Sequence, residues 1–380
     1  MKKSGKEVSF EGIFRILLMI FIVGTNISPY LLTEVLVGHR VKNAFDLTSE
    51  IKQINFLDSN ALYETFQSSE RLLVNLYILG HSAVYVFFFI SGFSVGRFFI
   101  SGKNAGEFLF WRWRKIYIPS VLLLTPFYLF WFFVERGRGN GEYLLQILTM
   151  GFDYGNGEIS TPAWFLTPLF ASYGMALLMT KIVNNSSLRR LLSLLALMVL
   201  ASMSPVWVNS DYSNYYYPIP LISFFFAGQI IAELKNSPSV RTNMTFRLYM
   251  EYGTILIIIS FTLMSYFSAL DFLSREVLRL FFAYTLLFIY ISFKDSIHSN
   301  LFFKLHFLNR LSRSTFVVFL IHYPIFIYCY HEKYFDGIFG VIAFIGFVTI
   351  IFILSLFLQE MLLQRLDAWL LKLDQKGYLA

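Results

Sequence analysis

Apolar runs of about twenty residues recur from one end of this 380-residue chain to the other. Each run is long enough to cross the ~30 Å hydrocarbon core of a membrane as an α-helix. A backbone inside that core must satisfy its own hydrogen bonds, which α-helices do within a single segment. Hydrophobic residues make up 56% of the chain and charged residues only 14%, a composition more apolar than a soluble domain of this length needs. The pattern therefore predicts an all-α, polytopic membrane protein.

The chain is predicted to contain ten membrane spans, at 13–32, 72–97, 116–134, 162–183, 189–208, 218–234, 252–270, 277–293, 315–331 and 338–362. If the N-terminus lies inside, the inner segments hold more than twice as many Lys and Arg residues as the outer ones. Short cytoplasmic loops carry this excess in membrane proteins, so both termini are predicted to be cytoplasmic. Residues 1–380 are predicted to form a single transmembrane domain without a separate soluble domain. The net charge of +7 then follows from topology and does not indicate a nucleic-acid partner.

Arg15 and Asn26 are polar residues inside the otherwise apolar first span. At about 100° and 1.5 Å per residue, their spacing places both on one helix face, roughly 16 Å apart along the axis. Polar groups inside a membrane usually face the protein interior or a wet cavity. The pair therefore predicts a polar chamber between the helices.

The second span ends in FFFISGFSVGR, Phe87 to Arg97. Ser91 and Gly92 permit a close approach to the backbone, either by a ligand or by a neighbouring helix. Arg97 lies at the inner boundary, where arginine side chains commonly reach toward lipid head groups. His81 lies nearer the outer end of the same span and can reach a site that opens to that side.

The segment WRWRKIYIP, Trp111 to Pro119, leads into the third span. Arg112 and Lys115 are three residues apart and share a helix face, and with Arg97 and Arg114 they form a candidate cluster for binding phosphate oxygens. The same residues also suit membrane topology and contact with lipid head groups, for which the flanking tryptophans are typical. Both interpretations stay open at this point.

Two further segments carry candidate site residues. In TPAWFLTPLFASY, the rings of Trp164 and Tyr173 suit stacking on a sugar, although aromatic side chains also gather at membrane interfaces. In STFVVFLIHYPIF, His322 lies inside the ninth span, at a depth similar to that of Asn26. It is a catalytic candidate or a packed histidine that is bonded to a neighbouring helix. No His, Cys or carboxylate cluster has metal-ligand spacing, so no metal is expected.

Taken together and in this order, the motifs resemble the acyltransferase 3 family of integral membrane O-acyltransferases. Its members typically carry an arginine and a histidine in the first helix, then FFxxSGF, RxxR with a nearby proline, a WFL-like segment and a late YLxH-like motif. In the present sequence Arg15 is followed by FFFISGF (87–93), RWRKIYIP (112–119), WFLTPLFASY (164–173) and FLIHYP (319–324). The resemblance covers nearly the whole chain.

The resemblance implies a protein of the bacterial cytoplasmic membrane that moves an acyl group, usually acetyl, from cytoplasmic acyl-CoA to a carbohydrate on the other side. The implied partners are the lipid bilayer, acyl-CoA, a carbohydrate or lipid-linked glycan acceptor, and glycan-assembly proteins. Carried over by motif, the roles would be catalysis by Arg15, Asn26 and His322, donor binding by Ser91, Gly92, Arg97, Arg112 and Lys115, and acceptor binding by His81, Trp164 and Tyr173.

Two positions depart from the family pattern. Lys115 replaces the second arginine of RxxR and keeps the charge but not the planar, two-pronged geometry of a guanidinium. Asn26 replaces the first-helix histidine, and a carboxamide cannot accept a proton near neutral pH as imidazole can. Three explanations stay open for Asn26: His322 or His81 supplies the base, the protein keeps only a binding, scaffolding or carrier role in glycan assembly, or the asparagine is an introduced change. A general solute transporter is disfavoured because no internal repeat is visible.

Overall fold

The structure is a computed structural model that describes residues 12–24, 68–101, 104–134, 141–149, 165–182, 195–196, 219–236, 283, 286–287, 306–331 and 340–375. All regular structure across these ranges is helical, and none of these residues lies in a strand. The predicted all-α class is therefore confirmed for this part of the chain.

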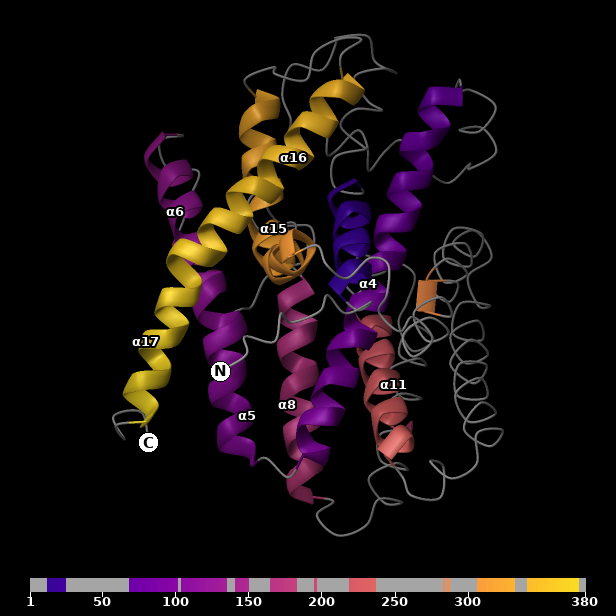
Figure 1. The fold of residues 1–380 in the computed structure, drawn as a ribbon, viewed down its shortest axis with the longest axis vertical. Helices are drawn as coiled ribbons and strands as arrows, with labels where there is room; N and C mark the ends of the chain where they lie inside the picture. Colours follow the sequence, from indigo (N-terminus) through magenta and orange to yellow (C-terminus); the bar gives the residue numbers. More distant parts are fainter. Residues whose placement is uncertain are drawn as a thin grey trace.

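The first described helix is Gly12–Gly24, which contains Arg15. The others, in chain order, are α4 (Ser68–Ile100), α5 (Ala105–Arg112), η1 (Trp113–Tyr117), α6 (Ile118–Val134), α7 (Gly141–Thr149), α8 (Leu166–Ile182), α11 (Ile219–Asn236), α15 (His306–His331), α16 (Gly340–Leu358), η5 (Gln359–Leu363) and α17 (Gln364–Gln375). Short π-helical turns, η1 and η5, join α5 to α6 and α16 to α17, so each set reads as one long helix in Figure 1.

Local sequence accounts for both ends of the α5–η1 segment. Asn104 caps α5, since its side-chain oxygen accepts a hydrogen bond from the backbone N–H of Glu107 at 2.8 Å. Pro119 is the second residue of α6, two positions after η1, and lacks the N–H that would bond to the carbonyl of Lys115. A wider π-helical turn lets the helix continue past that position, with the N–H of Ile118 bonded to the carbonyl of Trp113. The helix therefore begins well before the predicted span boundary at residue 116.

Helices α4 and α11 pack closely through glycines and run side by side in Figure 1. A Cβ atom added at Gly92 would lie 1.8 Å from the carbonyl oxygen of Phe225, and one at Gly228 would lie 2.0 Å from the carbonyl oxygen of Phe89. Of the two sequence interpretations of Gly92, the structure supports close approach by a neighbouring helix.

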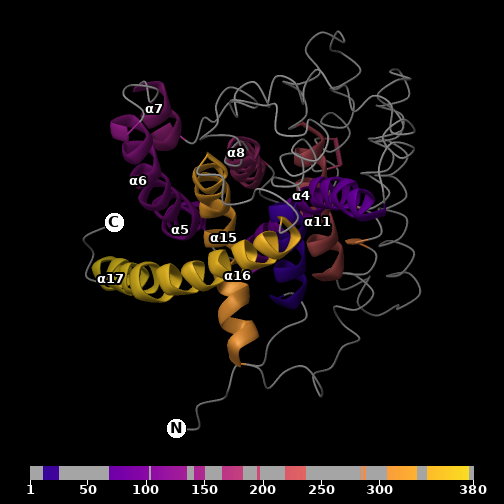
Figure 2. The same ribbon diagram turned by 90° about the horizontal axis from the view of Figure 1, so that it is seen from above.

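Helix α16 crosses α15, as the view from above shows (Figure 2). The continuation of α16 through η5 into α17 then brings the end of the long helix toward α5 and η1 (Figures 1 and 2). This arrangement places residues near both π-helical turns around one cavity.

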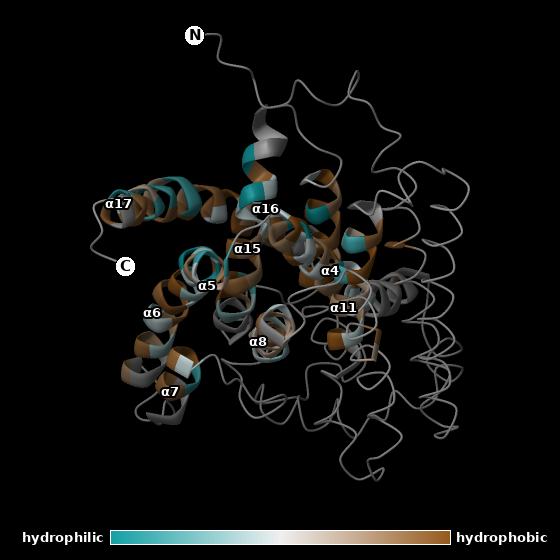
Figure 3. Ribbon diagram, turned by 90° about the horizontal axis from the view of Figure 1, so that it is seen from below, coloured by the Kyte–Doolittle hydropathy of each residue, from teal (hydrophilic) through white to brown (hydrophobic). Residues whose placement is uncertain are grey.

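Two of the described helices are long and apolar enough to span a membrane, Ser82–Ile100 and Ile345–Leu373. Shorter apolar helices cover Gly12–Gly24, Leu166–Thr180 and Leu221–Leu234. Hydrophobic residues colour most of the described helices, while α5 and α17 also carry hydrophilic positions (Figure 3). These helices agree with a membrane protein but do not confirm ten spans or cytoplasmic termini. The predicted span 252–270, and most of 189–208 and 277–293, lie outside the described residues.

Candidate functional site

A cavity of about 870 Å³ lies where most of the described helices meet. Helix Gly12–Gly24, α4, the continuous α5–η1–α6 helix, α8, α15 and the η5–α17 segment all contribute side chains to it. Its polar and charged lining residues are Arg15, Ser91, Ser94, Arg112, Arg114, Lys115, Tyr173, Ser312, Arg313, Thr315, Gln359, Gln364 and Asp367. Its volume is within the range of ordinary small-molecule sites.

The cavity carries a strong excess of positive charge. Five cationic side chains and one carboxylate, that of Asp367, stand among the described residues that line it. Unlike charges on an open surface, charges around a partly enclosed cavity are poorly screened by solvent. The arrangement therefore favours a ligand with several negative charges.

Arg112 is the most buried of these cations, with 8% of its surface exposed. Its guanidinium carbon lies 4.1 Å from the ring centroid of Trp111 and 4.1 Å from that of Tyr173. Within the described part of the chain, its Nε and Nη2 atoms have no hydrogen-bond partner. Burial lowers the pKa of the Arg112 guanidinium; Tyr173 raises it, and the positive charge of Arg15 lowers it. A buried cation with unused donors beside a second cation is arranged to bind an anion.

The two basic residues of η1 are held by one carboxylate from α17. The Nε atom of Arg114 lies 2.8 Å from Oδ1 of Asp367, and Nζ of Lys115 donates a hydrogen bond of 2.8 Å to Oδ2 of the same residue. Asp367 thus already neutralises part of the positive charge at this side of the cavity. No sequence pattern points to Asp367, because 252 residues separate it from Lys115.

Five of the predicted site residues meet at this cavity, namely Arg15, Ser91, Arg112, Lys115 and Tyr173. They come from the first described helix, α4, α5, η1 and α8. The electrostatic neighbours of Tyr173 include Arg112, Ser91 and Arg15, so these residues form one group. The expected grouping of Arg15 with the RWRK segment is thus present in the structure.

Other predicted residues lie elsewhere. Gly92 faces the α11 backbone, and Arg97 is exposed in the last turn of α4 and does not line the cavity. Asn26 and Trp164 lie outside the described residues, as does the side chain of His81. Their predicted roles stay predictions.

His322 lies in the interior of α15 and is fully buried. Its Nδ1 atom is 2.8 Å from the carbonyl oxygen of Phe319 and 3.1 Å from that of Val318. Because carbonyls only accept, Nδ1 carries the hydrogen, and Nε2 is the acceptor nitrogen of the neutral ring. His322 is not among the residues that line the cavity, although Thr315 and Phe316 of the same helix are. About 10 Å along the helix axis separates His322 from those two residues.

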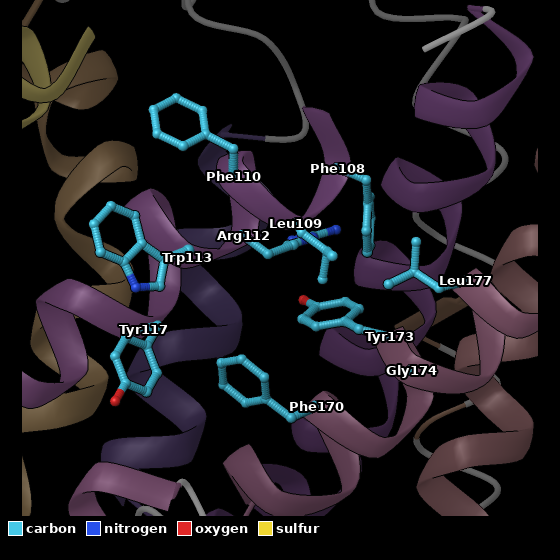
Figure 4. Close-up of a pocket in the computed structure, with 10 residues that line it drawn as sticks. All are labelled: Phe108, Leu109, Phe110, Arg112, Trp113, Tyr117, Phe170, Tyr173, Gly174 and Leu177. Atoms are coloured by element: carbon cyan, nitrogen blue, oxygen red, sulfur yellow. The ribbon is translucent and has the colours of Figure 1, made fainter. Parts of the chain in front are cut away.

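A second cavity, of about 540 Å³, adjoins the first and shares Arg112 and Tyr173 with it (Figure 4). It lies between the α5–η1 segment and α8. Its lining residues are Phe108, Leu109, Phe110, Arg112, Trp113, Tyr117, Phe170, Tyr173, Gly174 and Leu177. This cavity is largely apolar, in contrast to the first.

Several cavity residues were missed by sequence reasoning, among them Arg313, Gln359, Gln364 and Asp367. Arg313 stands just before the predicted span 315–331, where a cation is typical of a membrane boundary and does not by itself indicate a site. The polar positions of Gln364 and Asp367 give the C-terminal helix an amphipathic pattern, which signals a polar face but not the partner of that face.

A family model described as an acyltransferase domain matches residues 12–359, which is nearly the whole chain. Neither a curated protein nor a solved structure matches the chain significantly. The match includes all the predicted site residues and ends before Asp367.

Proposed function

This chain belongs to the acyltransferase 3 family of membrane acyltransferases, and we propose that it transfers an acyl group, typically acetyl, from acyl-CoA to a hydroxyl of a cell-surface or exopolysaccharide sugar. In this proposal it is a multi-pass protein of the bacterial cytoplasmic membrane, and the donor enters from the cytoplasm. The observation that carries the proposal is the cavity with five cations and one carboxylate, in which Arg112 is buried without a hydrogen-bond partner among the described residues.

The cavity suits the donor because coenzyme A is a polyanion. Guanidinium groups bind phosphate oxygens through two parallel hydrogen bonds, and Arg15 and Arg112 supply two such groups at neighbouring positions. Arg313 adds a third guanidinium on the α15 side. Lys115 adds a positive charge, which its ion pair with Asp367 partly neutralises. We assign phosphate binding to these residues, and leave Arg97 out because it does not line the cavity.

The proposed transfer forms a C–O bond between the acceptor hydroxyl and the acyl carbon and breaks the C–S bond of the thioester. The hydroxyl proton leaves with a base, and coenzyme A departs as a thiolate that takes up a proton. Asn26 can orient the hydroxyl or bond to the thioester carbonyl but cannot take the proton. His322 stays the candidate base. Because its ring does not line the donor cavity, its contact with the acceptor hydroxyl would have to form when the substrates bind. Trp164 and His81 stay the candidates for holding the sugar, whereas Tyr173 packs against Arg112 in the donor site.

Binding of coenzyme A to the purified full-length protein tests the donor site. Arg112→Lys keeps the charge but loses the planar group stacked between Trp111 and Tyr173. Loss of one of the two parallel hydrogen bonds to a phosphate, about 1.5–3 kcal/mol, should weaken binding at least tenfold. Arg97→Lys is the matched control. Because Arg97 is exposed and does not line the cavity, this substitution should leave the dissociation constant of CoA unchanged. Equal effects of both substitutions on the dissociation constant would place the CoA phosphates elsewhere.

Turnover is tested with labelled acetyl-CoA and a sugar acceptor, with release of coenzyme A as the readout. Above-background release that His322→Gln abolishes supports the assignment of the proton to His322. Background release from the native protein, together with recovery in Asn26→His, would show that the missing imidazole limits catalysis and that the native protein does not transfer.

A second function, favoured by Asn26, is a non-catalytic role as a binding or carrier protein in glycan assembly. The two functions differ in what a deletion strain lacks. Loss of ester-linked acyl groups from an otherwise normal polymer supports transfer, whereas loss of the polymer itself supports carriage.

A further inference from the structure

The smaller cavity is apolar almost throughout (Figure 4). Phenyl, indole and aliphatic groups from α5, η1 and α8 form most of its wall, and Arg112 is the single charged side chain among the described residues that line it. The hydroxyl of Tyr117 donates a hydrogen bond of 2.8 Å to the carbonyl oxygen of Leu148 and is thereby satisfied by α7. Such a wall offers hydrocarbon contact and few polar partners.

The two cavities meet at Arg112 and Tyr173, which line both. The cationic cavity lies on one side of this pair and the apolar cavity on the other. The Arg112 guanidinium is buried and has unused N–H donors. A ligand in the apolar cavity would therefore bind more tightly if it carried a hydrogen-bond acceptor near this guanidinium. A single ligand could fill both cavities if its anionic groups lay in the cationic cavity and its hydrocarbon chain in the apolar cavity. A carbonyl group between these two parts would then lie beside Arg112.

We propose that the apolar cavity is an acyl-chain pocket, so that this protein accepts acyl-CoA donors with chains longer than acetyl. This inference rests on the proposed function. The CoA phosphates occupy the cationic cavity, the pantetheine arm with its amide carbonyls passes Arg112 and Tyr173, and the acyl chain extends between Phe108, Phe170 and Leu177.

A sugar fits the apolar cavity less well, because its hydroxyls would lose water without finding hydrogen-bond partners on an aromatic and aliphatic wall. A separate bilayer lipid would place a second anionic group at Arg112, where the donor already binds. A chain continuous with the donor satisfies both cavities with a single occupant.

Chain burial predicts a specific dependence of affinity on length. Each methylene transferred from water to an apolar site strengthens binding roughly fourfold, until the pocket is filled. Acetyl-CoA adds a single methyl group, so it draws little on the pocket. Hexanoyl-CoA and decanoyl-CoA should bind progressively more tightly than acetyl-CoA.

Gly174 of α8 allows the pocket to be filled without disturbing its wall. It lines the cavity, and a Cβ atom built on it meets no atom within 4 Å (Figure 4). A leucine at this position has open space in front of it. Gly346 of α16 provides the matched control, because a Cβ atom there also meets nothing within 4 Å and the residue lines neither cavity.

The experiment measures the dissociation constants of CoA, acetyl-CoA, hexanoyl-CoA and decanoyl-CoA for the full-length protein in lipid nanodiscs, by competition with labelled CoA. Native protein and Gly346→Leu should bind decanoyl-CoA at least a hundredfold more tightly than acetyl-CoA. In Gly174→Leu, the preference for decanoyl-CoA over acetyl-CoA should be at least tenfold smaller, while the affinities for CoA and acetyl-CoA stay unchanged. Comparison with Gly346→Leu cancels partition of long chains into the lipid.

Two results would overturn the proposal that this cavity binds the acyl chain. One is an equal preference for decanoyl-CoA in Gly174→Leu and the native protein, and the other is equal affinity for all chain lengths. In either case normal CoA binding would leave the proposed function intact, whereas failure of CoA itself to bind would reject both. Should Gly174→Leu fail to fold, Leu109→Trp replaces it. Leu109 lines the pocket but is 56% exposed, so a larger side chain there narrows the entrance without entering the core. That variant should show the same selective loss.

Discussion

Arg112 combines features that are seldom found together in one side chain. It is charged, buried and stacked between two aromatic rings, and part of its guanidinium has no hydrogen-bond partner in the described chain. Leaving such donors unpaired costs free energy, which a protein recovers when a ligand anion binds. Because Arg112 stands at the junction of two cavities, it can hold the phosphate end of a donor whose acyl chain occupies the adjoining cavity.

Asp367 has the opposite role at the same site. Its carboxylate bridges Arg114 and Lys115 and lies in the lining of the cationic cavity. An internal anion there holds two cations in place in the absence of ligand, and it also competes with ligand phosphates for them.

Asp367→Asn should therefore strengthen CoA binding. Removal of one competing unit charge a few ångströms from the phosphates is worth about 1 kcal/mol even in a water-like medium, or roughly fivefold in affinity. The free energy of unfolding should fall by about 1 kcal/mol, because the substitution breaks two partly exposed ion pairs. Isothermal titration and thermal unfolding of the purified protein measure the two effects.

Glu360→Gln is the control for this substitution. It removes the ion pair with Arg310, and neither Glu360 nor Arg310 lines a cavity. CoA affinity should stay at the native value. Weaker CoA binding in Asp367→Asn would show instead that the carboxylate is needed to orient Arg114 and Lys115.

At the scale of elements, the two π-helical turns have the clearest consequence. Both η1 and η5 contribute side chains to the cationic cavity, Arg114 and Lys115 from the first and Gln359 and Leu363 from the second. A π-helical turn changes the facing of all residues that follow it, since it inserts one residue into the helical repeat. In the structure α17, which follows η5, lies against η1, and the Asp367 bridge joins the two.

Close contact between α4 and α11 is the other element-scale feature. Gly92 and Gly228 bring the two backbones together, and α4 carries Ser91 and Ser94 into the cavity from the adjoining positions. The glycines at this interface therefore set the position of α4, whose serines form part of the cavity wall.

Gly228→Ala should separate these helices. The new Cβ atom would lie 2.0 Å from the carbonyl oxygen of Phe89 and 2.8 Å from the amide nitrogen of Phe93, so backbone must move. Overpacking of this kind costs about 1–3 kcal/mol, which should appear as a lower unfolding temperature in detergent. Gly346→Ala, with open space at its Cβ position and a better helix former in place of glycine, should not lower that temperature. Native stability of Gly228→Ala would contradict the close α4–α11 contact.

Across the molecule, two adjoining cavities with different chemistry lie among the described helices. Residues from the first described helix and from α17 line the same cavity, so parts of the chain that are far apart in sequence build the site together. The amphipathic α17 lies beyond the matched family region, which ends at residue 359, and supplies Asp367. The site thus combines residues of the matched region with residues that follow it, among them Gln364 and Asp367.

Much of the helical layout could be predicted from the sequence. The predicted spans 162–183 and 218–234 correspond closely to α8 (Leu166–Ile182) and α11 (Ile219–Asn236). The prediction works because a long apolar run must satisfy its backbone internally in a membrane, and helical length then follows from hydrocarbon thickness. The number of spans and the side on which the termini lie stay predictions.

The site was only partly predictable. Motif order placed Arg15, Ser91, Arg112, Lys115 and Tyr173 in one site, and the structure brings these residues together. The interpretation of Gly92 was open between ligand and helix contact, and only the position of Phe225 decided it. Likewise, no local pattern linked Asp367 to Lys115 across 252 residues.

The chain alone therefore determined helical class, the candidate cations and the family, because hydrophobic length and motif order are properties of neighbouring residues. Tertiary structure alone decided which cations are paired, which glycine packs against which backbone, and that an apolar pocket adjoins the cationic one. Those features depend on distances between segments far apart in sequence, and such distances are set by the packing of whole helices.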